Sequence, residues 1–281
     1  MKEFTYSIVI PFRDKMDLLQ IACKSIPDRE DIQILIIDNS KESMEKCYTP
    51  VHTVAQVDYL TSSPTKGAGC ARNVGVANAK GKWLLFLDSD DYYTKEAFSA
   101  FDKYKNSEND IVFFDIRAEF LSTKEPSKRS ENYNRNIANK DEDRLRYRTA
   151  VPYCKMVRRQ LVIDNSLSFQ EVPVSNDLMF SLTVGHAAKK CAIDDTVCYC
   201  VTEGDKNTSL IKTKSPENEF CRYRIVIQRN HFFENIGRDD LRFRLISRII
   251  YAFRHFGFKE GMKYLKLAHQ EHQNIFKGHR F

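Results

Sequence analysis

Three aspartates follow a short apolar run within the first third of the chain. Residues 83–87 are continuously apolar, and Asp88, Asp90 and Asp91 come almost directly after them. Carboxylates this close repel one another unless a positive charge lies between them, and oxygen ligands of this kind favour Mg²⁺ or Mn²⁺. The same pattern is common in acidic turns where an aspartate caps the next helix, and that is the simpler interpretation of Asp-x-Asp taken alone.

A glycine loop and an arginine lie upstream of these aspartates. Gly67 and Gly69 open a stretch of small residues that predicts a helix over residues 70–79, and Arg72 falls in its first turn. Free N–H groups at the start of a helix can receive a phosphate, and an arginine adds a bidentate donor for the same group. A plain turn is the simpler interpretation of Gly-x-Gly, and Arg72 could instead pair with an acid on the helix surface.

Apolar runs of strand length recur through the first 120 residues and alternate with helical stretches. They span residues 6–11, 32–37, 57–61, 83–87 and 111–116. Strands joined through helices pair in parallel, so the pattern predicts an α/β fold with an open, mainly parallel sheet. In such sheets ligands bind at the carboxyl ends of the strands, which is where Asp38 and the three later aspartates fall.

The pattern changes in the second half of the chain. Residues 122–148 are strongly polar and predict a mobile loop with one helical turn from Asp141. A helix is expected from Asn176 or Asp177 to Ala188. Asp177 could have no role beyond capping this helix. Residues 191–201 alternate as in a strand or a hairpin.

Length and composition are typical of a folded protein without a membrane span. The 281 residues suffice for one large domain, or for a domain with an appendage. No apolar run reaches the roughly 18 residues of a membrane span, and the N-terminus lacks the apolar core of a signal peptide. We therefore expect a cytoplasmic protein. The eight cysteines include no Cys-x-x-Cys pair, which favours buried thiols over a disulfide framework or a metal site.

The net charge of +6 is concentrated at the C-terminal end. Residues 217–281 hold 13 Lys and Arg against 7 Asp and Glu, whereas the preceding 216 residues are balanced at 31 of each. Helical periodicity also runs from Pro216 to the end of the chain. We therefore divide the chain into an α/β domain over residues 1–215 and a basic amphipathic helical segment over residues 216–281.

Five separated motifs, taken in order, resemble the family 2 glycosyltransferases. They are residues 7–11 (SIVIP), 34–40 (ILIIDNS), 64–75 (PTKGAGCARNVG), 87–91 (LDSDD) and the segment from Arg158 to Asp177. The resemblance covers about the first 210 residues. It implies the GT-A fold, a nucleotide-binding α/β domain, and an inverting transferase that uses a nucleotide sugar.

By resemblance, the carboxyl edge of the sheet holds the nucleotide and a divalent metal ion. Asp90 would bind Mn²⁺ or Mg²⁺, which neutralises the leaving pyrophosphate, and Asp88 would touch the ribose or the metal. Asp38 would accept a hydrogen bond from uracil, and Asp91 would cap the helix that follows it. The residues around the nucleotide would be Pro11, Phe12, Asp38, Gly67, Arg72 and Asp88.

The resemblance also assigns Asp177 as the base that takes the proton of the acceptor hydroxyl, which gives inversion by direct displacement. It implies transfer from a UDP-sugar to a glycan or a lipid-linked acceptor in bacterial surface polysaccharide biosynthesis. The family usually has Glu-Asp where this chain has Asn176-Asp177. That departure motivates an alternative, a non-catalytic assembly partner that binds nucleotide or glycan. A NAD-dependent Rossmann enzyme is disfavoured, because no Gly-x-Gly-x-x-Gly follows the first apolar run.

The basic segment over residues 217–281 admits three interpretations. Its helices could pack on the catalytic domain and complete the acceptor pocket. They could instead make peripheral contact with an anionic membrane at its inner face, where basic residues interleaved with Phe and Tyr would favour binding. Nucleic-acid binding is disfavoured, because acidic residues are interspersed and no recognition motif is present.

Overall fold

The computed structural model describes residues 3–204 and 215–279, which divide into two compact units. The first unit runs to Val172 and resumes from Asn176 to the end of the last strand. The second combines Pro173–Ser175 with the C-terminal helices. Each unit has its own hydrophobic core.

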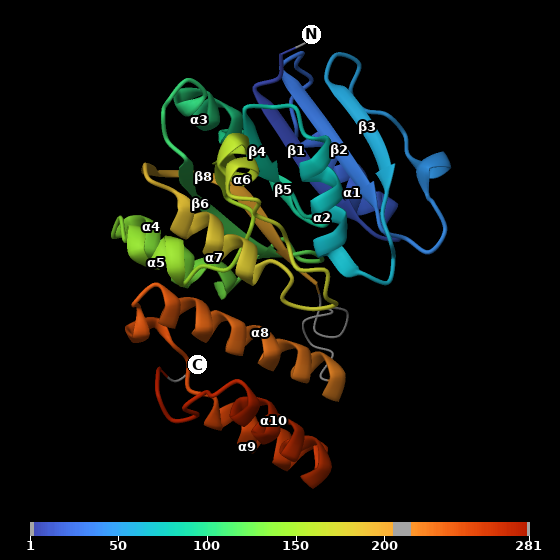
Figure 1. Ribbon diagram of the computed structural model, residues 1–281. Helices are drawn as coiled ribbons and strands as arrows, with labels where there is room; N and C mark the ends of the chain where they lie inside the picture. The colour runs from blue at the N-terminus through green and yellow to red at the C-terminus, as the bar shows by residue number, and fades with distance from the viewer. Residues whose placement is uncertain (1–2, 205–214, 280–281) are drawn as a thin grey trace. The chain divides into compact units, whose positions relative to one another are not determined.

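The first unit is built on one sheet, in which the described residues form eight strands ordered β3-β2-β1-β4-β7-β6-β8-β5 (Figure 1). The strands span Tyr6–Phe12 (β1), Ile32–Asp38 (β2), Gln56–Thr61 (β3), Trp83–Phe86 (β4), Tyr92–Tyr93 (β5), Ile111–Phe120 (β6), Lys155–Arg158 (β7) and Cys191–Glu203 (β8). Strands β3, β2, β1 and β4 pair in parallel, as do β6 and β8. Strand β7 is antiparallel to β4 and β6, and β5 is antiparallel to β8. The prediction of an α/β fold with an open, mainly parallel sheet is confirmed.

Helices pack against this sheet (Figure 1). They are α1 (Met16–Lys24), α2 (Gly67–Asn78), α3 (Ala97–Tyr104), α4 (Glu131–Ala138), α5 (Glu142–Tyr147), α6 (Arg159–Asp164) and α7 (Leu178–Ala187), with short 3₁₀ turns η1 (Glu45–Cys47) and η2 (Lys128–Ser130). Helix α2 packs on β1 and β2, α3 on β8, and α4 on β6. Strands β1, β2 and β4 are buried along their whole length, which explains why they are continuously apolar with few exceptions.

The register of the central strands brings their carboxyl ends to one edge of the sheet. Phe12, the last residue of β1, pairs with Asp38, the last residue of β2. On the other side of β1, the Leu87 N–H donates to the Val9 carbonyl at 3.1 Å and prolongs the pairing with β4. Asp38 and Asp88 therefore leave their strands at the same edge, where ligands bind in open α/β sheets.

The prediction of a mobile loop over residues 122–148 is wrong, but its one helical turn from Asp141 is confirmed, because Asp141 caps α5. The segment contains η2 and the helices α4 and α5. Tyr133 and Ile137 lie about one helical turn apart and are both buried, and Leu145 is fully buried in the same core. The few apolar residues of this polar segment are enough to anchor it, because their spacing places them on the inner faces of the helices.

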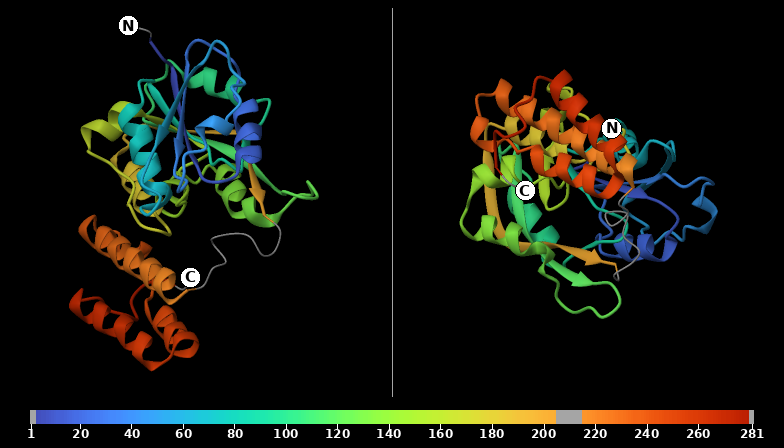
Figure 2. Two further views of the ribbon diagram at one scale, coloured as in Figure 1. Left: turned by 90° about the vertical axis from the view of Figure 1, so that its right-hand side faces the viewer. Right: turned by 90° about the horizontal axis from the view of Figure 1, so that it is seen from below.

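The second unit contains α8 (Pro216–Asn235), the 3₁₀ turn η4 (Asp239–Leu241), α9 (Ile246–Phe256) and α10 (Phe258–Gln270) (Figure 2). Its core includes the rings of Tyr223 and Tyr264, with centroids 4.5 Å apart. Gly257, at φ 85°, joins α9 directly to α10 in a conformation that other residues disfavour. Across residues 3–204 and 215–279, no helix is both long and apolar enough to cross a membrane.

Candidate active site

The turn after β4 is fixed by hydrogen bonds to β8. The backbone N–H of Asp88 donates to the Tyr199 hydroxyl at 3.0 Å, and that hydroxyl donates to the Asp91 carboxylate at 2.8 Å. Asp91 also accepts from the backbone N–H of Thr202 at 2.6 Å. The prediction that Asp91 caps a helix is therefore wrong. Helix α3 starts only at Ala97, and Asp91 instead ties the turn to β8.

Asp88 and Asp90 remain as the carboxylates of this turn that a ligand can reach. The Asp88 side chain is 28% exposed, and Asp90 is exposed. Desolvation by the protein around it, followed by the charge of Asp88, raises the pKa of Asp90. Burial, followed by the charges of Asp90 and Asp88, raises the pKa of Asp91 well above its ordinary value. Such shifts indicate a negative potential that a cation would relieve.

The oxygen donors of this turn fit a hard divalent cation. In nucleotide sites, Mg²⁺ is typically held by one or two carboxylates, while waters and phosphate oxygens complete its coordination. Asp88 and Asp90 supply such a pair. Within the described part of the chain, no group of three or more His, Cys, Asp or Glu side chains could enclose a metal ion by itself. A carboxylate pair fits a metal whose remaining ligands are waters and phosphate oxygens.

Arg72 connects this turn to the segment that precedes α7. Its side chain is nearly buried, and it donates from Nη2 to Asp88 Oδ1 at 2.6 Å and from Nη1 to Asn176 Oδ1 at 2.9 Å. The guanidinium lies 5.5 Å from the centroid of the Phe169 ring. The alternative of a surface arginine is therefore wrong, although the expected acidic partner is present. Arg72 is a buried cation shared by Asp88 and the residue next to Asp177.

Asp177 occupies the N-cap position of α7, yet its carboxylate makes no capping hydrogen bond. Burial raises the pKa of Asp177, while the positive charges of Arg72 and Lys155 act in the opposite direction. The preceding Ser175 has φ 55°, a left-handed conformation unusual for serine that helps to set the entry into α7. A carboxylate that caps nothing and has a raised pKa is suited to proton transfer.

Lys155 is a charged residue of this site that sequence reasoning missed. It is the first residue of β7 and is only 4% exposed. Its ammonium lies 5.8 Å from the centroid of the Phe113 ring on the neighbouring strand β6. Burial lowers the pKa of Lys155 to about 8, against the attraction of Asp177. The available signal was a lysine inside the otherwise apolar stretch 151–157, because lysine is rarely buried without a reason.

Asp38 lies at the same edge and organises the loop after β2. Its carboxylate accepts from the N–H groups of Ser40 and Met44 at 2.9 and 2.7 Å, and from the Tyr59 hydroxyl at 2.9 Å. Burial acts to raise the pKa of Asp38, but these hydrogen bonds outweigh it and lower that pKa. Asp38 is thus held ionised in a fixed orientation.

The other residues predicted around a nucleotide lie on adjoining elements. Pro11 and Phe12 end β1, both are buried, and the Phe12 ring belongs to the hydrophobic core, which does not favour stacking on a base. The Phe12 carbonyl accepts from the N–H of Asn39 at 2.8 Å and so supports the turn after Asp38. Gly67 starts α2 at φ 72°. The sheet therefore brings these residues to one edge, and Arg72 contacts the aspartate turn directly.

Comparisons of sequence agree with this arrangement. The protein-family model described as glycosyl transferase family 2 matches residues 7–165, more than half of the chain. A poly(ribitol-phosphate) beta-glucosyltransferase of Bacillus spizizenii is 24% identical over 224 residues, which cover 75% of this chain and 34% of that protein. An uncharacterised glycosyltransferase of Rickettsia conorii is 31% identical over 110 residues, which cover 38% of this chain and 18% of that protein. The chain thus spans about a third or less of these curated relatives.

Solved structures share the fold. The structure of S. aureus TarS 1–349 in complex with UDP-GlcNAc matches with a TM-score of 0.71 and 17% identity, over 95% of this chain and 80% of that chain. The mannosyltransferase PcManGT of Pyrobaculum calidifontis, in complex with GDP-Man and Mn²⁺, matches with a TM-score of 0.56 and 11% identity, over 95% and 76% of the two chains. At these identities the likeness establishes the fold alone, which is the GT-A fold.

Proposed function

Because this chain belongs to glycosyl transferase family 2, we propose that it transfers a sugar from a nucleotide sugar to an acceptor hydroxyl with inversion. One observation carries the proposal. Buried Arg72 donates to Asp88, one of the carboxylate pair Asp88 and Asp90, and its positive charge also acts on the Asp177 carboxylate. The site therefore combines groups that can bind a diphosphate with its cation and a base that can activate a hydroxyl.

We propose a UDP-sugar as the donor. Structural neighbours have been solved with UDP-GlcNAc, with UDP and with GDP-Man, which supports a nucleotide sugar in this fold. The uracil would lie beside Asp38, on the turn that Phe12 supports. The ribose and diphosphate would extend towards Asp88, with Pro11, Gly67 and Arg72 lining the path.

Asp88 and Asp90 would hold Mn²⁺ or Mg²⁺. When bound, the metal would neutralise the negative charge that develops on the leaving diphosphate. Arg72 fixes the Asp88 carboxylate through a 2.6 Å charge-assisted hydrogen bond and brings a positive charge of its own to the site. The hydrogen bonds of Asp91 with Tyr199 and Thr202 keep the turn in one conformation, in which Asp88 and Asp90 could bind the metal.

Asp177 is the proposed catalytic base. As the acceptor oxygen bonds to the anomeric carbon, its proton passes to the Asp177 carboxylate, and the nucleotide diphosphate leaves with the electrons of the broken C–O bond. This single displacement inverts the anomeric centre without a covalent enzyme intermediate.

We further propose that the acceptor is a glycan or a lipid-linked precursor of a surface polysaccharide. The relative that acts on poly(ribitol phosphate) supports this class of acceptor. Peripheral contact of residues 217–281 with an anionic membrane would keep the enzyme at the inner, cytoplasmic face, close to such a substrate.

Calorimetric titration of UDP and GDP, with and without Mn²⁺, tests the donor and metal assignments. We expect UDP to bind more tightly than GDP, Mn²⁺ to be required, and Asp90→Asn to weaken binding about tenfold or more. Asp195→Asn, at an exposed aspartate of β8, is the matched control and should bind as the wild type does. Equal affinity for UDP with and without metal would exclude the proposed metal site.

A further inference from the structure

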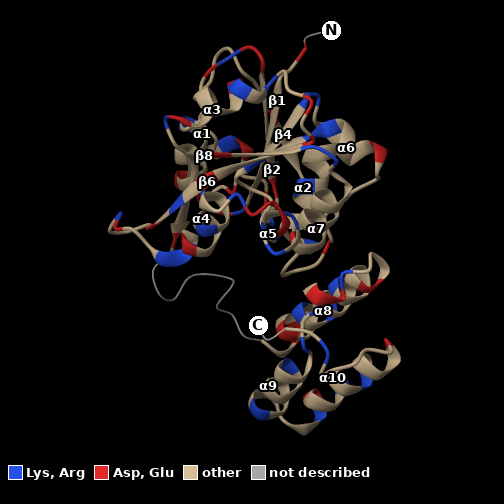
Figure 3. Ribbon diagram, turned by 90° about the vertical axis from the view of Figure 1, so that its left-hand side faces the viewer, with Lys and Arg blue, Asp and Glu red and all other residues tan. Residues whose placement is uncertain are grey.

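Part of the positive charge of the second unit is paired with acids inside the unit. Lys and Arg lie along all three of its helices (Figure 3). Several are paired at short range: Arg222 with Glu219, Arg238 with Asp240, Arg242 with Glu234, Lys263 with Glu260, and Lys277 with Asp239. The excess of 13 basic over 7 acidic residues in segment 217–281 is therefore not spread evenly over its surface.

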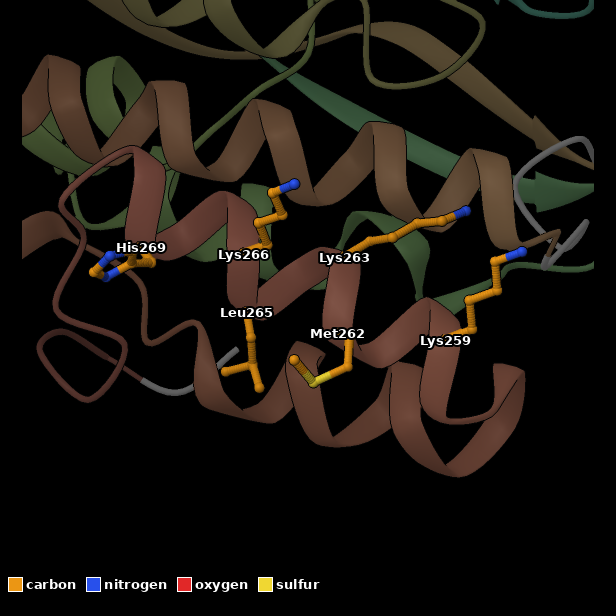
Figure 4. Close-up of a pocket in the computed structure, with 6 residues that line it drawn as sticks. All are labelled: Lys259, Met262, Lys263, Leu265, Lys266 and His269. Atoms are coloured by element: carbon orange, nitrogen blue, oxygen red, sulfur yellow. The ribbon is translucent and has the colours of Figure 1, made fainter.

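Helix α10 carries cations that these pairs do not neutralise. Lys259 and Lys266 are exposed, and neither has an ion-pair partner among residues 3–204 and 215–279. With Lys263 they recur at i, i+4 and i+7, which places all three along one side of the helix. Figure 4 shows these three lysine side chains extending from the same flank of α10.

An apolar stripe runs beside the lysines. Phe258, Met262 and Leu265 follow the same i, i+4, i+7 spacing, one position earlier in the chain. Phe258 is 76% exposed and Met262 is 42% exposed, which is costly for an aromatic ring and a thioether in water. Met262 and Leu265 extend from α10 in a different direction from the lysines (Figure 4).

The two stripes border a shallow hollow of about 450 Å³. Its lining contains four basic and two apolar side chains and no acid: Lys259, Met262, Lys263, Leu265, Lys266 and His269. The phosphate backbone of a nucleic acid would bind the lysines but would leave Phe258 and Met262 in water. An anionic bilayer uses both, because acyl chains receive the apolar stripe while lysines reach back to the headgroups.

We propose that this face of α10 is a docking surface for anionic lipid, with Phe258 and Met262 inserted at the interface and Lys259 and Lys266, unpaired among the described residues, on the headgroups. The inference rests on the membrane contact proposed above and is independent of the transfer reaction. Each lysine near a negative membrane surface contributes attraction that salt screens, so binding should be lost at high ionic strength.

Co-sedimentation of the full chain with vesicles tests the proposal. We expect binding to phosphatidylglycerol–phosphatidylcholine vesicles and little binding to phosphatidylcholine alone. The double variant Lys259→Gln/Lys266→Gln should lower the partition coefficient about tenfold or more, and Phe258→Ser/Met262→Ser should lower it as well. Phe276→Ser is the matched control, because Phe276 is 66% exposed outside this face, and it should bind as the wild type does.

The possible outcomes distinguish the membrane contact as a whole from its assignment to α10. No binding of the wild type to anionic vesicles would overturn the membrane contact as a whole. Binding that is equal in the wild type and in both double variants would overturn the assignment to α10. Tighter binding to duplex RNA than to the vesicles at the same salt would overturn lipid as the partner. Unchanged melting temperatures of the variants would show that lost binding is not lost folding.

Discussion

At the scale of single residues, Arg72 explains how the chain accommodates Asn176 in place of the glutamate that is usual in the family. The guanidinium donates to the neutral Asn176 amide oxygen and keeps a carboxylate hydrogen bond only with Asp88. Its remaining positive charge acts on Asp177. The departure at residue 176 therefore changes which groups share Arg72 and leaves Asp177 in place as the proposed base.

Lys155 gives a prediction about pH. Its positive charge lowers the pKa of Asp177, so replacing it by methionine should raise that pKa and move the acidic limb of the activity profile to higher pH. We expect Lys155→Met to lose about tenfold in kcat/KM on this limb. The loss should fade as pH rises through about 8, because Lys155 itself then becomes neutral in the wild type.

The same substitution, Lys155→Met, should raise stability although it lowers activity. The pKa of Lys155 is depressed in the folded state, so protonation disfavours folding at neutral pH, and the penalty disappears as pH rises towards the unfolded value. Lys155→Met should therefore unfold at a higher temperature than the wild type near pH 7. The profiles of kcat/KM and of melting temperature against pH check both effects. A loss of activity that is equal at every pH would refute the electrostatic role.

Residue roles that depend on neighbouring sequence could be predicted, whereas roles that depend on contacts with distant strands could not. Asp88 and Asp90 were identified because they directly follow a buried run. Asp91 was misassigned, because its partners Tyr199 and Thr202 lie more than 100 residues away on β8. Lys155 was missed because only the pairing of β7 with β4 and β6 brings it towards the carboxyl edge.

At the scale of elements, helix α2 positions the segment that carries the proposed base. Gly69 packs directly on the segment before α7, and a Cβ atom there would lie 2.0 Å from the Gln170 carbonyl oxygen and 2.9 Å from Asn176 Cβ. Asn73 reinforces this contact through hydrogen bonds with both backbone groups of Phe169, at 2.9 and 2.8 Å. A glycine at 69 is therefore a packing requirement.

We predict that Gly69→Ala displaces the segment that carries Asp177. Unfolding free energy should fall by about 1–3 kcal/mol, as for other overpacked contacts. Activity should fall further than the affinity for UDP, because the base moves relative to the nucleotide. Urea unfolding and steady-state kinetics measure these changes, with Ala77→Ser on the exposed side of α2 as the control. A variant with wild-type stability and kcat would show that α2 does not position the base.

The main strands could be predicted because burial on both faces makes them continuously apolar, whereas segment 122–148 could not. Its mean composition is polar, and its fold depends on three well-spaced residues, Tyr133, Ile137 and Leu145. A short edge strand such as β5 (Tyr92–Tyr93) has no sequence pattern of its own, because it forms only by pairing with β8.

At the scale of the whole molecule, the chain consists of two units with separate cores, one centred on the sheet and one on Tyr223, Ile249 and Tyr264. We propose residues 1–215 as the catalytic domain and residues 216–281 as the helical segment. A fragment of residues 1–215 should fold and bind UDP with the same metal requirement as the full chain. Circular dichroism and calorimetry check this, and a fragment that fails to fold would show that the helical segment is part of the catalytic domain.

The release of UDP from UDP-sugars in the presence of Mn²⁺, compared between the wild type and Asp177→Asn, tests the central claim most directly. We predict measurable turnover by the wild type, with water or a glycan as acceptor. Asp177→Asn should lower it about 10²–10⁴-fold while binding of UDP–Mn²⁺ is retained. Binding of UDP–Mn²⁺ by the wild type without turnover of any donor, or equal rates for the two proteins, would contradict the account and favour a non-catalytic binding partner.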